Sequence, residues 1–201
     1  MKNDILSLPG YRLCEYLLVL QPHEDLWNKV MKVREEFFEK YKAPSAQWGK
    51  PHVTLVKFVQ LQLMEERLIN RLKMVAMAMP AFKVELKDFG SFPSHTIYLN
   101  IETKDAIQVL VKSLKAAQQL MKSKDIKPHF MDNPHLTIAR QLLPWQYEQG
   151  WLEYSHRHFT GRFIAKNMLL LRRPEGAKGY QVAQSFEFLN MPVVTTQGAL
   201  F

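Results

Sequence analysis

Cysteine is almost absent from this sequence, since Cys14 is the only one among 201 residues. An internal disulfide is therefore impossible, and so is a zinc site built from several cysteines. Long apolar runs are also lacking. No stretch approaches the roughly 20 consecutive apolar residues of a membrane helix, and Leu17–Leu20 is too short for the core of a secretion signal. We therefore expect a protein of the cytoplasm, with no membrane as a partner.

Acidic residues are fewer than basic ones, with 19 Asp and Glu against 27 Lys and Arg, so the net charge is +8. A basic excess is typical of proteins that bind polyanions such as nucleic acid or phosphorylated metabolites, although it also serves solubility. The hydrophobic fraction of 47% is that of an ordinary globular protein and excludes disorder. The length suits one well-packed domain or two small lobes.

Hydrophobic spacing predicts strands that alternate with helices. Strands are expected at 12–20, 52–60, 81–89, 96–102, 135–141, 159–173 and 179–189, the last two as a hairpin around Pro174–Gly176. Helices are expected at 23–41, 68–79, 107–121 and 144–155, and loops at 43–51 and 122–134. Residues 190–201 show no clear pattern.

One heptapeptide pattern, Pro-His-(Val/Leu)-Thr-(Leu/Ile)-(Val/Ala)-(Lys/Arg), occurs twice, at Pro51–Lys57 and Pro134–Arg140. Each copy falls on an expected strand that follows a helix and a loop. Chance duplication has a probability on the order of one in ten thousand or less, because proline and the other fixed residue types are scarce. We interpret the pattern as an internal duplication, with two similar lobes forming a single domain over residues 1–201.

The two copies predict a site for phosphodiester chemistry. A strand alternates its side chains between faces, so His52 and Thr54 share one face of the first copy, and His135 and Thr137 share one face of the second. If the lobes face each other, one histidine can accept a proton from water while the other protonates the departing oxygen. The threonine hydroxyls can donate hydrogen bonds to phosphate oxygens, and no metal is required.

At these residues the sequence resembles the 2H phosphoesterase superfamily, named for its two His-X-Thr/Ser motifs; Pro51–Leu55 and Pro134–Ile138 both match. It is most similar to the 2′-5′ RNA ligase and RNA 2′,3′-cyclic phosphodiesterase (LigT-like) branch. The resemblance implies a bilobal α+β fold, with two antiparallel sheets facing a central cleft and helices outside. It also implies metal-free hydrolysis of ribose 2′,3′-cyclic phosphates on RNA ends or small nucleotides, and in some members the reverse 2′-5′ ligation.

The resemblance assigns catalytic roles to His52, His135, Thr54 and Thr137 without saying which histidine is the base. It also places an aromatic residue on a strand between the motifs, here Tyr98. Tyr98 would bind substrate, or would be a half-buried sheet tyrosine. We expect a monomer that needs no cofactor and acts on RNA ends or a cyclic nucleotide.

Basic residues occupy the seventh position of both copies, and Lys57 and Arg140 are candidates for binding phosphate. Strict alternation puts them on the face opposite the histidines, where they would cover the sheet edge unless the strands bulge. Arg172 and Arg173 are candidate RNA contacts at the expected hairpin tip.

Two alternatives remain open. His156 and His158 could form a metal pair, but we expect no acidic or cysteine partner for them and therefore interpret them as solvated. The protein could also be a non-catalytic RNA-binding module with a vestigial site. The presence of both motif histidines argues against that second alternative.

Overall fold

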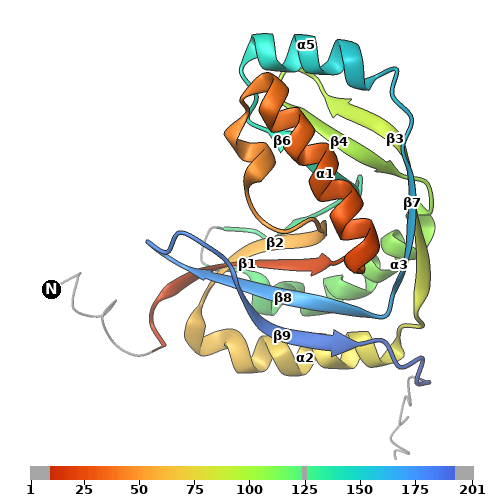
Figure 1. The fold of residues 1–201 in the computed structure, drawn as a ribbon. Helices are drawn as coiled ribbons and strands as arrows, with labels where there is room; N and C mark the ends of the chain where they lie inside the picture. The colour runs from red at the N-terminus through yellow and green to blue at the C-terminus, as the bar shows by residue number, and fades with distance from the viewer. Residues whose placement is uncertain (1–9, 124–125, 193–201) are drawn as a thin grey trace, which may run out of the picture.

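The computed structural model describes residues 10–123 and 126–192 (Figure 1). Residues 1–9, where we expect no secretion signal, and residues 193–201 of the C-terminal tail lie outside the described part. The strands are β1 (Leu13–Leu20), β2 (Val53–Leu61), β3 (Phe82–Phe92), β4 (Thr96–Ile101), β5 (His129–Phe130), β6 (His135–Arg140), β7 (Thr160–Ala165), β8 (Asn167–Pro174) and β9 (Gln181–Glu187). The helices are α1 (Glu24–Tyr41), α2 (Glu65–Ala78), α3 (Lys104–Leu114), α4 (Gln118–Met121) and α5 (Pro144–Tyr154).

The strands form one antiparallel sheet in the order β7-β3-β4-β6-β2-β1-β8-β9, with β5 pairing alongside β2. This order is symmetric about the junction of β6 and β2, where Val53 paired with Leu136 is the only paired position. The expected α+β fold is confirmed. The two sheets that we expected as separate are joined into one at this single bridge.

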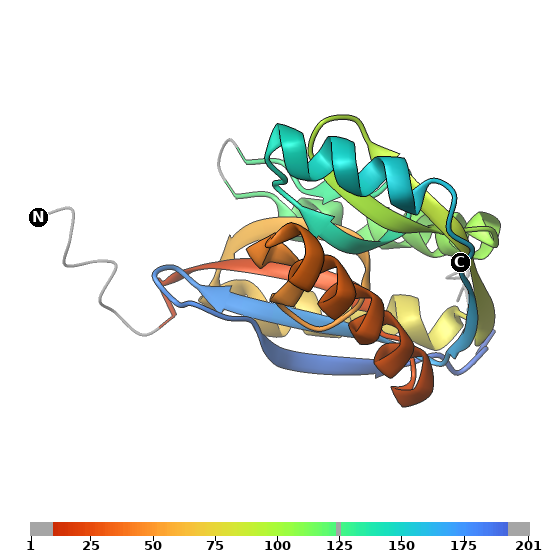
Figure 2. The same cartoon turned by 45° about the horizontal axis from the view of Figure 1, so that its top comes forward.

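Two helices, α1 and α3, cross to the other half of the sheet (Figures 1 and 2). Helix α1 follows β1 in the chain but packs on β6 of the other half, and α3 follows β4 but packs on β2. Helix α1 buries an apolar stripe because its apolar residues recur every three or four positions. The buried residues of α1 are Leu26, Val30, Val33, Arg34, Phe37 and Tyr41.

Three expected elements differ from the structure. The strand expected at 159–173 is two strands that separate at Lys166. The first, β7, pairs with β3, and the second, β8, pairs with β1. The helix expected at 107–121 is interrupted by a 3₁₀ turn at Lys115–Ala117. Strand β5 lies in an expected loop, and two residues are too few to show any periodicity. Within the described ranges, no helix is both long and apolar enough to cross a membrane.

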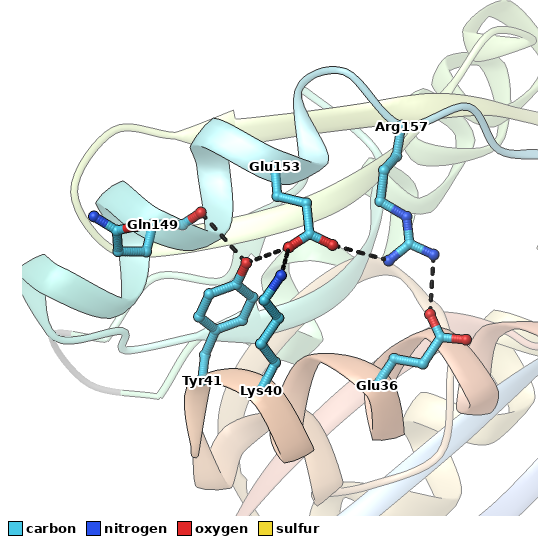
Figure 3. Close-up of polar contacts among 6 residues, drawn as sticks. All are labelled: Glu36, Lys40, Tyr41, Gln149, Glu153 and Arg157. Carbon is cyan, nitrogen blue, oxygen red and sulfur yellow. Dashed lines mark hydrogen bonds and ion pairs between the residues drawn. The ribbon is translucent and has the colours of Figure 1, made fainter.

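A polar cluster fastens α5 to α1 (Figure 3). The carboxylate of Glu153 accepts hydrogen bonds from Lys40 Nζ at 2.5 Å and from the buried Tyr41 hydroxyl at 2.6 Å. Arg157 lies 3.6 Å from the other oxygen of Glu153 and donates to Glu36 at 2.9 Å. The hydrogen bonds from Lys40 and Tyr41 hold the pKa of Glu153 below its usual value.

We expect Glu153→Ala to lower the free energy of unfolding by about 1–3 kcal/mol at pH 7, because the Tyr41 hydroxyl keeps only its longer contact of 3.4 Å with the carbonyl oxygen of Gln149 and Lys40 loses its partner. Since folding lowers the pKa of Glu153, its carboxylate stabilises the fold above the unfolded pKa, and this contribution is lost as the pH falls through the folded pKa. Urea unfolding at pH 7 and at pH 3 measures both effects. The matched control is Glu85→Ala, which removes a surface pair with Lys83 and should cost less than about 1 kcal/mol. Equal losses would contradict the expectation.

Candidate active site

The single bridge between the halves brings the two motifs together. Val53 of the first motif lies opposite Leu136 of the second, and both side chains are fully buried. Continuing the antiparallel register by one position on each side places each histidine opposite the threonine of the other motif. The motif side chains therefore lie together on the face opposite the core, which we call the site face. They are His52, Thr54, His135 and Thr137.

Both imidazoles are oriented in the same way. His52 Nδ1 lies 2.7 Å from the carbonyl oxygen of Lys50, and His135 Nδ1 lies 2.8 Å from that of Asn133. A carbonyl oxygen only accepts, so Nδ1 carries the proton in each neutral ring. Nε2 is then left with a lone pair for proton transfer. The carbonyl group two positions before each histidine thus sets its tautomer.

Burial lowers the pKa of both histidines below the ordinary value, while their hydrogen bonds to the carbonyl oxygens act in the opposite direction. For His52, the positive charges of Arg34 and Arg140 and the proximity of His135 lower the pKa further. Burial therefore favours the neutral form of both rings in the free protein.

Each motif strand carries a β-bulge directly after its threonine. The pairing of β2 with β1 skips Leu55, and the pairing of β6 with β4 skips Ile138, the matching position. An extra residue resets the alternation, so Lys57 and Arg140 return to the site face. Our expectation from strict alternation, which placed them on the opposite face, is wrong. The two successive apolar residues after each threonine are the sequence signal that would have revealed the bulges.

The two basic residues differ in their partners. Lys57 Nζ lies 2.9 Å from Glu15 Oε2, and Arg173 donates to the other oxygen of the same carboxylate at 2.9 Å. Arg140 is exposed and forms no ion pair with any residue in the described ranges. Its backbone is held by Ser45, whose Oγ accepts from Arg140 N at 3.0 Å. The guanidinium of Arg140 is therefore available to an anion, whereas Lys57 is already paired with a carboxylate that it shares with Arg173.

Tyr98 packs beside one of the two histidines. Its ring centroid lies 4.8 Å from that of His135 and 4.7 Å from that of Phe92, and only 7% of the residue is exposed. Gly90 makes room for the ring, because a Cβ there would lie 2.5 Å from Tyr98 Cε2. Tyr98 thus supports His135 from within the sheet. Phe92, which the sequence analysis missed, lies 5.0 Å from His135 and completes this aromatic cluster.

Other sequence candidates lie away from the motifs. His158 Nδ1 is 3.3 Å from Asp88 Oδ1, which corrects our view that it has no acidic neighbour. Among the described residues, no group of three or more His, Cys, Asp or Glu could hold a metal ion. Arg172 turns inward and donates to both oxygens of Glu65 at 3.0 and 3.1 Å, so it is not the expected RNA contact.

Similar proteins share this architecture. The family model described as the 2′-5′ RNA ligase superfamily matches residues 22–177, a range that contains both motifs. The protein TT0787 of Thermus thermophilus has a TM-score of 0.62 and 18% identity, covering 87% of this chain and 98% of its own. E. coli LigT in apo form has a TM-score of 0.61 and 13% identity, covering 88% and 98%.

A second structure of E. coli LigT, complexed with 3′-AMP, has a TM-score of 0.58 and 15% identity, again covering 88% of this chain and 98% of its own. No curated protein matches the sequence. At these identities the solved structures establish the fold, and the family model covers well over half of the chain. The protein belongs to the 2′-5′ RNA ligase superfamily.

Proposed function

We propose that this protein is a metal-independent phosphodiesterase that hydrolyses ribose 2′,3′-cyclic phosphates of RNA ends or small nucleotides. One observation carries the proposal. The two histidines lie on one face, each with Nδ1 bound to a carbonyl oxygen and Nε2 left for proton transfer, and the pairing of Val53 with Leu136 brings their motifs side by side. A pair of proton-transfer groups around one position is what in-line displacement at phosphorus needs.

The reaction follows from these groups. Water attacks the cyclic phosphorus while the Nε2 of one neutral histidine accepts its proton. The bond from phosphorus to one ribose oxygen breaks, and the Nε2–H of the other, protonated histidine donates a proton to that oxygen. Thr54, Thr137 and Arg140 hold the non-bridging phosphate oxygens as negative charge develops. The products are a ribose monophosphate with a free hydroxyl, and the two histidines have exchanged protonation states.

Two findings support a nucleotide substrate. E. coli LigT, which has a similar fold, has been solved with 3′-AMP, a nucleotide with a ribose phosphate. The net charge of +8 favours binding of polyanions such as RNA. The family description also names a ligase. If a 5′-hydroxyl of RNA replaces the attacking water, the same groups form a 2′-5′ bond, so ligation is the second candidate activity.

The test is incubation of the protein, in EDTA, with nucleoside 2′,3′-cyclic phosphates and with RNA that ends in a 2′,3′-cyclic phosphate. We expect hydrolysis to a single monophosphate, identified as the 2′- or 3′-isomer by chromatography against standards. Adding RNA with a 5′-hydroxyl tests ligation in the same assay. Turnover only with added metal would refute the metal-independent mechanism. RNA binding without any turnover would instead favour a non-catalytic RNA-binding module.

A further inference from the structure

Arg34 is a buried cation without a carboxylate. It lies on α1, on the same stripe as Val30 and Phe37, and only 6% of it is exposed. Burial lowers its pKa to about 10, and the nearby charge of Arg140 acts in the same direction, so it is still charged at neutral pH. No acidic side chain in the described ranges pairs with it. Burying an unpaired charge is costly, so compensating interactions are expected.

The hydrogen bonds of Arg34 join the two motifs. Its Nε donates to the carbonyl oxygen of Ile138 at 3.2 Å, and its Nη1 donates to that of Gly49 at 2.9 Å. Ile138 is the bulge residue that returns Arg140 to the site face. Gly49 directly precedes Lys50, whose carbonyl oxygen orients His52. One guanidinium therefore supports the orientation of a histidine from the first motif and of a basic residue from the second.

The matching bulge in the first motif has a different partner. The carbonyl oxygen of its bulge residue, Leu55, accepts a hydrogen bond from the backbone nitrogen of Met131 at 2.9 Å. That neutral donor brings no charge. The two bulges therefore differ in their hydrogen-bond donor. Only the bulge at Ile138, next to Arg140, is bound by a buried positive charge.

The charged groups around His52 are all cationic or neutral. Arg34 reaches it from α1 and Arg140 from β6, and His135 of β6 is the remaining titratable neighbour. Lys50, in the loop before His52, turns its ammonium to the Trp27 ring at 5.3 Å. Nη2 of Arg34 makes no hydrogen bond within the described ranges. The only fully buried side-chain polar atom without a partner there is Arg172 Nε, so Nη2 of Arg34 is at least partly accessible to solvent. No acidic side chain in the described ranges pairs with either arginine of this cationic cluster.

We propose that Arg34 is a positioning residue that holds the two motifs together, and that its unpaired charge is balanced by the phosphate of the substrate. The proposal rests on the proposed function, because it assigns the phosphate of that same reaction to one side of the site. It also predicts that phosphate binds on the side of Arg140 rather than beside Lys57, whose ammonium already has the Glu15 carboxylate as a partner.

The test compares Arg34→Gln and Arg34→Lys with wild type, using inorganic phosphate binding by calorimetry, the titration of the His52 ring by NMR, and steady-state hydrolysis. We expect Arg34→Gln to weaken phosphate binding by about tenfold or more and to move the His52 midpoint upward. Arg34→Lys keeps the charge but cannot span both carbonyl oxygens. It should therefore bind phosphate within a few-fold of wild type while kcat falls by more than tenfold. Arg71→Gln is the matched control, because Arg71 lies on α2 and also donates from Nε to a backbone carbonyl oxygen, that of Ala116. This variant should leave all three readouts unchanged.

Unchanged phosphate binding and an unchanged His52 midpoint in Arg34→Gln would overturn the proposal. If Arg34→Gln does not fold, Arg34→Lys tests the proposal instead. Equal losses of phosphate affinity and kcat, or a kcat equal to that of wild type, would contradict the expected combination of retained affinity and reduced kcat. Phosphate binding and the NMR titration require no turnover. A wild-type protein that binds phosphate but does not hydrolyse cyclic phosphates would refute the proposed function and leave the role of Arg34 standing.

Discussion

His52→Ala and His135→Ala are each expected to lower kcat for 2′,3′-cyclic phosphate hydrolysis by about 10²–10⁴-fold, because each removes one of the two proton-transfer groups. Neither ring packs in the core in a way that makes it essential for folding, since both lie on the half-buried site face. The double variant should be little worse than either single variant, because both groups act in the same step. Steady-state rates with EDTA, together with thermal melts, separate lost chemistry from lost fold.

The pH dependence provides an internal check on this pair. One histidine must be neutral and the other protonated, and burial lowers the pKa of both in the free protein. The profile of kcat/KM should therefore be bell-shaped, with its maximum below about pH 6.5, and should fall towards pH 8 as the acid loses its proton. His156→Ala, far along the chain near the end of α5, is the matched control and should keep the full rate. A flat profile between pH 5 and pH 8, or a single variant with wild-type kcat, would rule out the two-histidine mechanism.

Arg140→Gln is expected to lower kcat/KM by about 10–100-fold, the loss of one or two charge-assisted hydrogen bonds to phosphate. Lys57→Gln, at the matching position of the first motif, should lower it by only a few-fold. The difference arises because Glu15 pairs with Lys57 at 2.9 Å, whereas no carboxylate in the described part of the chain pairs with Arg140. Competitive inhibition by inorganic phosphate, measured beside hydrolysis, shows whether the lost interaction is with the phosphate itself.

Two further variants sharpen the comparison of the basic residues. Arg140→Lys keeps the charge but loses the planar fork, so it should recover part of the lost kcat/KM. Glu15→Gln releases Lys57 from its carboxylate and should make Lys57→Gln more harmful in that background. Equal losses for Lys57→Gln and Arg140→Gln in the wild-type background would show that the site uses both basic residues alike.

Local patterns were enough to predict most elements and the motif side chains. Helix α1 begins and ends within a residue of the expected 23–41, because its apolar stripe and its polar N-terminal residues are all local features. The two His-X-Thr motifs appear as a repeated string, and alternation along a strand is sufficient to put each histidine beside its threonine. Family membership followed from the same residues.

Features that depend on partners distant in the chain could not be predicted in this way. The break at Lys166 exists because β7 pairs with β3 and β8 pairs with β1, and the local pattern of 159–173 does not specify that change of partner. Likewise, Arg34 has the spacing of a core residue, and only the carbonyl oxygens of Gly49 and Ile138 explain why a guanidinium lies there. Hydrogen-bond partners so far apart in the chain leave no periodic trace.

The sequence by itself determined the duplicated motif, its four polar side chains and the family. Only the tertiary structure decided how unequal the two halves of that duplication are. The bulges after Thr54 and Thr137 return both basic residues to the site face, but Lys57 pairs there with Glu15, whereas Arg140 pairs with no carboxylate in the described ranges. The physical reason is that charge balance in a site depends on every side chain folded against it, whereas a repeated string records only the residues along one strand.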